Sequence, residues 1–131
     1  MSKIKLPLKL LLEVMKEIEV EGPCGKIKTM GIVDTGATHV MIAEDVYKKT
    51  CLWDETSGFV TVASGDIFET KAGFVNVKFE ECPGKKVLSF VGPFTLIGMN
   101  YLSEAGAVID AKEGTVTCKL VEKKLEEATK V

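Results

Sequence analysis

One short run of the sequence combines a carboxylate with the backbone features that a hydrolytic site needs. Residues 31–38 read Gly-Ile-Val-Asp-Thr-Gly-Ala-Thr, so an apolar strand leads directly into Asp34 and a glycine-containing turn. Apolar flanks hold the carboxylate in a fixed and partly dry place, Gly36 allows a peptide backbone to approach closely, and the Thr35 hydroxyl can lock the turn by hydrogen bonding. A carboxylate in such a place can act as a general acid or base. Because Asp and Gly are also common in plain turns, the run by itself leaves both interpretations open.

A second run of related character follows later in the chain. Residues 94–102 read Phe-Thr-Leu-Ile-Gly-Met-Asn-Tyr-Leu and continue into Ala-Gly-Ala-Val-Ile-Asp at 105–110. The glycine of this run, Gly98, lies 62 residues after Gly36. Together the two runs resemble the aspartic protease family that contains the retroviral and retrotransposon enzymes, which pairs a hydrophobic-hydrophobic-Asp-Thr/Ser-Gly-Ala turn with a later hydrophobic-hydrophobic-Gly segment and a short helix. The resemblance covers roughly residues 27–118 and is closer to the retrotransposon and cellular branch than to the viral one.

The resemblance implies that Asp34 is the catalytic residue and that Thr35, Gly36 and Ala37 form the active-site turn. Peptide hydrolysis in this family needs two carboxylates beside one water molecule. This chain has one Asp-Thr-Gly, and that context is missing at its other aspartates, which are Asp45, Asp54, Asp66 and Asp110. The resemblance therefore implies a homodimer, in which each of two chains related by a two-fold axis supplies its Asp34. Two such close carboxylates share one proton, as is known for this protease class, and the reaction needs no metal and no cofactor.

The family also has a β-hairpin, the flap, between its two motifs. The flap covers the substrate, excludes water and hydrogen-bonds to the substrate backbone. The flap and substrate-binding residues implied here are Ser64, Gly65, Asp66 and Ile67. By analogy of position, pockets for apolar substrate side chains would be lined by Ile32, Ala37, Ile67, Phe94 and Leu96.

The chain departs from the family pattern beside both motifs. Viral members often have an aspartate directly after the alanine, paired with an arginine directly after the second glycine, whereas this chain has Thr38 and Met99 there. That ion pair is absent, so the dimer must be braced in another way. His39 is the only histidine, and the resemblance places it near the outer pocket without a catalytic role.

Strand patterns dominate the elements that must position these residues. Alternating apolar residues or short apolar runs bounded by turn residues predict strands over 6–14, 18–20, 27–33, 59–63, 67–71, 75–79, 87–91, 94–97, 107–110 and 115–120. The runs 59–63 and 67–71 flank Ser-Gly-Asp and predict a hairpin. Helices are predicted over 43–51, where acidic residues come early and basic ones late, and over 101–105, which ends at Gly106.

The order of these elements indicates the fold class. There is no strand–helix–strand alternation, so a parallel sheet is not expected. The prediction is a mainly β, closed antiparallel β-barrel with one or two short helices, which the resemblance specifies as the acid-protease (retropepsin-like) barrel of a homodimer. This domain would cover residues 1–120. The tail over 121–131 would form a short helix or be disordered.

Composition narrows the partners and the surroundings of the chain. The 131 residues fit one domain, and a net charge of −2 without a basic stripe gives no sign of nucleic-acid or membrane binding. Four scattered cysteines without a CxxC pair favour reduced thiols over a zinc site or a disulfide scaffold. Charged residues interrupt the apolar stretch at 10–12, so we expect neither a secretion signal nor a membrane span. These features predict a cytoplasmic protein.

The resulting hypothesis is an aspartic endopeptidase that cleaves extended polypeptide substrates as a homodimer. A non-catalytic dimerisation or peptide-binding module on the same fold is the first alternative, because a fold does not fix a function. An unrelated small β-barrel that binds a ligand is the second. Cleavage of unfolded casein distinguishes the first alternative, and the mass at high protein concentration distinguishes the second.

Overall fold

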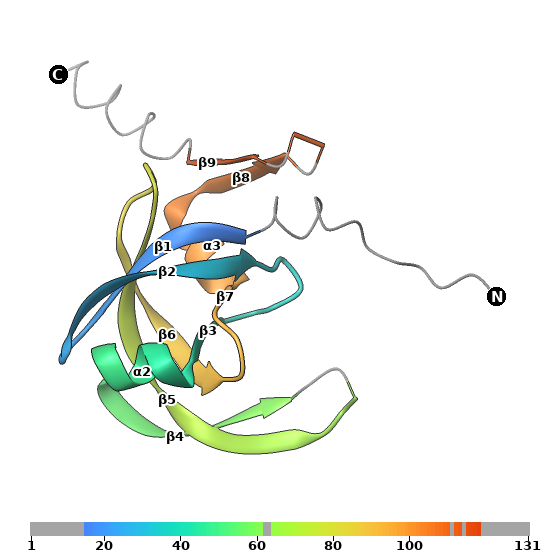
Figure 1. Ribbon diagram of the computed structural model, residues 1–131. Coiled ribbons are helices and arrows are strands. Elements are labelled where there is room, and N and C mark those ends of the chain that lie inside the picture. Colours follow the sequence, from blue (N-terminus) through green and yellow to red (C-terminus); the bar gives the residue numbers. More distant parts are fainter. Residues whose placement is uncertain (1–14, 62–63, 111, 114, 119–131) are drawn as a thin grey trace, which may run out of the picture.

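The computed structural model describes residues 15–61, 64–110, 112–113 and 115–118, and this part of the chain contains nine strands and two short helices (Figure 1). In chain order the elements are β1 (Met15–Gly22), β2 (Gly25–Val33), β3 (Val40–Ala43), α2 (Glu44–Thr50), β4 (Trp53–Thr61), β5 (Ile67–Phe79), β6 (Lys85–Gly92), β7 (Leu96–Ile97), α3 (Met99–Ala105), β8 (Ala107–Asp110) and β9 (Thr115–Cys118). The prediction of a mainly β chain with one or two short helices is confirmed. The strand expected over 6–14 and the tail over 121–131 lie outside the described residues.

Seven strands form one sheet in the order β1-β2-β7-β3-β6-β5-β4, and β1 also pairs with β5. Because β1 is hydrogen-bonded to both β2 and β5, six of these strands close into a ring, with β4 attached outside it on β5. Strands β8 and β9 form a separate two-stranded sheet. Figure 1 shows this small sheet above the main one.

The main sheet is mixed, although most of its strand pairs are antiparallel as expected. Strand β7 runs parallel to β2, and β3 runs parallel to β6. Strand β3, which the sequence patterns did not predict, is separated from β6 by α2 and the whole β4–β5 hairpin. Long connections of this kind allow two strands to meet in parallel, whereas short turns do not.

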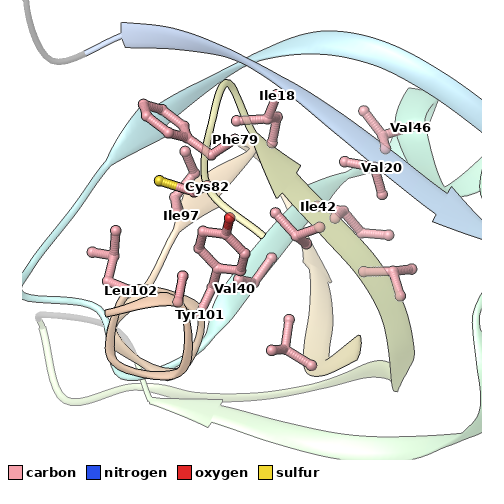
Figure 2. Close-up of a cluster of buried hydrophobic side chains, with 14 of the residues drawn as sticks. Ile18, Val20, Val40, Ile42, Val46, Phe79, Cys82, Ile97, Tyr101 and Leu102 are labelled. Atoms are coloured by element: carbon pink, nitrogen blue, oxygen red, sulfur yellow. The ribbon is translucent and has the colours of Figure 1, made fainter. Parts of the chain in front are cut away.

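Alternation along the strands builds the core. On β1, for example, Ile18 and Val20 are buried while the flanking glutamates are not. Figure 2 shows the core side chains gathered inside the ring; those labelled are Ile18, Val20, Val40, Ile42, Val46, Phe79, Cys82, Ile97, Tyr101 and Leu102. The deeply buried Tyr101 donates its hydroxyl hydrogen to the carbonyl oxygen of Pro83 at 3.0 Å. Burial raises the pKa of this phenol to about 12.

All four cysteines are paired, so the prediction of four reduced thiols is wrong. Disulfides join Cys24 to Cys51, with Cα atoms 5.4 Å apart, and Cys82 to Cys118, at 5.3 Å. Cys24 lies in the β1–β2 turn, and its amide donates to the carbonyl oxygen of Thr50 at 3.0 Å, which places the turn on the end of α2. Such pairing is more typical of oxidising compartments than of the cytoplasm.

One other local prediction agrees closely with the structure, and another differs from it. Helix α3 ends at Gly106, which has the left-handed conformation (φ 68°) expected at such a position. The region 67–79 forms one continuous strand, β5, where the patterns suggested two. Among the described residues, neither helix has the length and apolar character required to cross a membrane.

Candidate active site

Asp34 follows directly after the last residue of β2, at the start of a tight turn. Its amide donates to the carbonyl oxygen of Ile97 at 3.1 Å, and its own carbonyl oxygen accepts the amide of Ala37 at 3.1 Å. The amide of Gly36 donates to Oδ1 of the Asp34 side chain at 2.9 Å. The half-buried carboxylate is therefore held by the backbone of its own turn, which fixes its direction.

The second glycine run lies against this turn. Strand β7 is inserted between β2 and β3, two strands that are consecutive in the chain. Beyond β7, the amide of Met99 donates to the carbonyl oxygen of Ala37 at 2.8 Å, and the amide of Asn100 donates to that of Thr38 at 3.0 Å. The two runs that carry the resemblance thus meet in space and are joined by backbone hydrogen bonds.

Gly98 is the point of closest approach between the two runs. A Cβ atom at this position would collide with the backbone carbonyl of His39. Only glycine therefore allows the second run to pack beside the loop that carries Asp34.

Asn100 is a structural member of the site that sequence reasoning did not single out. Its Oδ1 accepts the amides of Val40 and Tyr101, both at 2.9 Å, and its Nδ2 donates to the carbonyl oxygen of Leu88 at 2.8 Å. One side chain thereby joins β3, β6 and α3 beneath the loop after Asp34. A polar residue inside an otherwise apolar run was the available signal.

The residues expected in the flap lie at the tip of the β4–β5 hairpin. Thr61 pairs with Ile67, and the turn between them includes Ser64, whose hydroxyl donates to Oδ2 of Asp66 at 2.9 Å. Gly65 adopts φ 90°, a conformation that suits glycine. Figure 1 shows this hairpin and the loop between β2 and β3 projecting from the same side of the molecule.

Alternation divides the hairpin into two faces. Gly58 and Ala72 share one face of the sheet with the Phe90 side chain of β6, here called the inner face, since a Cβ atom at Gly58 would lie 2.7 Å from the Phe90 ring and 2.8 Å from Ala72. The register places Phe68 on this inner face and Ile67 on the opposite one. Phe68 is therefore an inner-face candidate for substrate contact that the sequence analysis missed, and Ile67, named there as a pocket residue, lies on the outer face.

The other expected pocket residues are distributed around the turn. Ile32 and Leu96 are direct partners across β2 and β7, and both are half-buried. Phe94, which is 60% exposed, lies two residues before Leu96 on the approach to β7. The flap residues belong to a separate hairpin and form no hydrogen bond to the Asp34 turn within the described part of the chain.

Two hollows in the surface are not lined by residues of the Asp34 turn. Two surface hollows, of about 410 and 490 Å³, are lined by residues of other regions, Lys28 and Lys78 in one and Thr115–Cys118 in the other. Among the described residues, no cluster of three His, Cys, Asp or Glu side chains could hold a metal ion.

The comparisons found no protein-family model and no curated protein that matches this chain. The interpretation of the site depends on its own geometry.

Proposed function

We propose that this chain is one subunit of a homodimeric aspartic endopeptidase, with Asp34 of each subunit supplying one of two catalytic carboxylates. The observation that carries the proposal is the joining of the two glycine runs around Asp34. The amide of Gly36 orients one carboxylate oxygen, while Met99 and Asn100 hold the following residues of the turn. Such an arrangement positions a reactive carboxylate on rigid backbone, where small displacements would be costly for catalysis.

The requirement for a second chain follows from the count of carboxylates. The sequence has one Asp-Thr-Gly, and the turn around it is accessible, because Thr35 and Gly36 are exposed. A two-fold axis beside this turn would bring two copies of Asp34 together. Exposure of the turn supports the proposal, since a subunit contact needs it to be available.

In the proposed dimer the two carboxylates share one proton and hold a water molecule between them. The ionised carboxylate removes a proton from the water as the water oxygen bonds to the scissile carbonyl carbon. The protonated carboxylate donates its proton to the carbonyl oxygen. When the tetrahedral intermediate collapses, the carbon–nitrogen bond breaks and the leaving amine takes up the proton that the first carboxylate removed from the water. A hydroxyl of the intermediate returns a proton to the other carboxylate, so the pair again shares one proton. No covalent enzyme intermediate forms.

The substrate proposed for this site is an extended polypeptide. It would lie between the β4–β5 hairpin and the loop that carries Asp34, with main-chain hydrogen bonds giving affinity. Ile32 and Leu96 on the floor and Phe68 on the inner face of the hairpin favour apolar substrate side chains. The exposed Phe94 extends this apolar lining.

The test compares the wild-type chain with Asp34→Asn on unfolded casein and on a peptide library at several pH values. The matched control is Asp45→Asn, which changes an exposed aspartate in the first turn of α2. We expect cleavage by the wild-type and control proteins, and none by Asp34→Asn, because an amide cannot accept the proton of the water. A folded wild-type dimer without cleavage would instead support the non-catalytic peptide-binding module.

A further inference from the structure

Phe90 occupies a central position on β6. It is the register partner of Met41 on β3, the strand that follows the Asp34 turn. It is also the partner of Ala72 on β5, the second strand of the hairpin. Phe90 is thus the residue of β6 that stands between the two parts of the candidate site.

On the hairpin side, Phe90 supports the root of the β4–β5 hairpin. Its ring lies beneath Gly58, where even a Cβ atom would come within 2.7 Å of Cε1. Next to it, the hydroxyl of Thr70, the direct partner of Gly58, donates to the carbonyl oxygen of Val91 at 2.7 Å. The pair formed by Gly58 and Thr70 is therefore held closely on β6.

Beyond that pair the hairpin leaves the body of the protein. Residues 59–61 and 67–69 are here called the hairpin arm. Its aromatic and aliphatic side chains are mostly in solvent, with Phe59 68%, Ile67 66% and Phe68 55% exposed. The change from a packed root to an exposed arm occurs at the Gly58–Thr70 pair, directly above the Phe90 ring.

On the other side, Phe90 contacts the loop that carries the catalytic residue. Residues 34–39 are here called the Asp34 loop. The His39 ring meets the Phe90 ring edge-on, with centroids 5.4 Å apart and planes at 82°. His39 is held in turn by its backbone, which lies against Gly98, and by the contact of its Nδ1 with the Thr38 hydroxyl at 2.9 Å. One ring therefore touches both the seat of the hairpin and the Asp34 loop.

We propose that Phe90 is a positioning residue that sets the height of the hairpin arm above the Asp34 loop and couples the two. Gly58 is the complementary element, because the absence of a side chain there lets the hairpin settle onto the ring. Packed aromatic contacts transmit displacements because they are close-packed and resist deformation. A change in the ring moves the hairpin on one side and His39 on the other.

The consequence for catalysis depends on the proposed function. The hairpin would contact the main chain of the substrate equally in the ground state and the transition state, so its height affects uniform binding. Losing the Phe90 ring should therefore raise KM about tenfold and leave kcat within about threefold of its wild-type value. The conservative variant Phe90→Tyr keeps the ring and should therefore retain the wild-type KM.

The coupling can be tested without turnover, by amide hydrogen exchange in an Asp34→Asn background. We expect Phe90→Ala to increase exchange in both the hairpin arm and the Asp34 loop, with no change in β8 and β9. Gly58→Ala should also alter exchange in the Asp34 loop, but only while the Phe90 ring is present. The control Gly84→Ala, which places a Cβ 3.0 Å from the Asn76 side chain, should leave that loop unchanged.

The exchange and kinetic results distinguish a positioning role of Phe90 from a purely structural one. If Phe90→Ala speeds exchange throughout the chain, or leaves exchange unchanged in the hairpin arm and the Asp34 loop, Phe90 has only a structural role. Either result would overturn the inference. A fall in kcat at unchanged KM would overturn it as well. If the wild-type protein cleaves no peptide but the exchange coupling is present, the proposed function fails while the coupling between hairpin and loop stands.

Discussion

Gly98 packs directly against the backbone of His39, with no space for a side chain between them. This contact brings a segment from late in the chain beside the loop that carries the proposed catalytic residue. Its energetic importance can be measured separately from any activity.

We predict that Gly98→Ala lowers the free energy of unfolding by about 3 kcal/mol, because the added methyl group must displace backbone and not a mobile side chain. Denaturant unfolding measures the effect. In the control Gly84→Ala the neighbour is the end of the Asn76 side chain, which can move, so we expect a loss below about 1 kcal/mol. Equal losses in both variants would contradict the close approach at Gly98.

We predict that Asn100→Leu lowers the free energy of unfolding by about 3 kcal/mol, because it leaves the amide of Val40 and the carbonyl oxygen of Leu88 without their partner. Asn100→Asp keeps the acceptor and loses the donor, so its loss should be smaller. Amide exchange at Val40 provides a local readout: protection should be lost in the leucine variant and retained in the aspartate variant. Retained protection in both would show that another group satisfies this amide.

Titration of Tyr101 should appear in the stability of the protein at high pH. Its pKa is raised by burial from 10.0 to about 12, so the neutral phenol is favoured in the folded state. This stabilisation is therefore fully present below pH 10 and is lost as the pH rises from 10 to 12.

Tyrosinate absorbance and unfolding measured across that range check this prediction. Tyr101→Phe should remove the titration near pH 12, whereas Tyr47→Phe, at the only other tyrosine, should leave it in place. Tyr47 is half-buried, and its pKa is raised chiefly by its hydrogen bond to Glu55. A single transition that is unaffected by Tyr101→Phe would contradict the burial of this phenol.

Reduction of the disulfides should destabilise the chain markedly. In the chain-entropy description, a bridge with a sequence separation of 27 or 36 contributes about 4 kcal/mol to the free energy of unfolding. We expect Cys82→Ser and Cys24→Ser each to lower the free energy of unfolding, and each variant to expose one new free thiol. Four titratable thiols in the native wild-type protein under non-reducing conditions would refute both pairings.

Activity per subunit should rise with protein concentration, because one chain supplies one of the two proposed carboxylates. Adding excess Asp34→Asn subunits should suppress the wild-type activity through mixed dimers. Sedimentation at the same concentrations measures the association directly. Specific activity that stays constant while the protein dissociates into monomers would rule out a shared site.

Local features of the sequence predicted local structure well. The strand at 27–33 and the end of α3 at Gly106 depend on alternation and on one glycine, and both signals come from neighbouring residues. The tip of the β4–β5 hairpin was predicted in the same way. The turn around Asp34 was found because its residue types and their chemistry lie side by side in the chain.

The features that could not be predicted from the sequence depend on contacts between residues far apart in the chain. Strand β3 is only four residues long and pairs in parallel with β6, which no local pattern encodes. The cysteines are 27 and 36 residues apart, and only the folded turns bring each pair together. The faces of Ile67 and Phe68 depend on the register of β5, in which a shift of one residue exchanges the two sides.

The insertion of β7 between β2 and β3 has a consequence for how the protein is made. The amide of Asp34 is bound to the carbonyl oxygen of Ile97, so the turn cannot take its final form until the ribosome has released the residues of β7 and α3. Contacts between such widely separated segments also form slowly in refolding, because a long loop must close first. A nascent chain that already contains Asp34 therefore lacks the finished turn until the residues of β7 have been added to it.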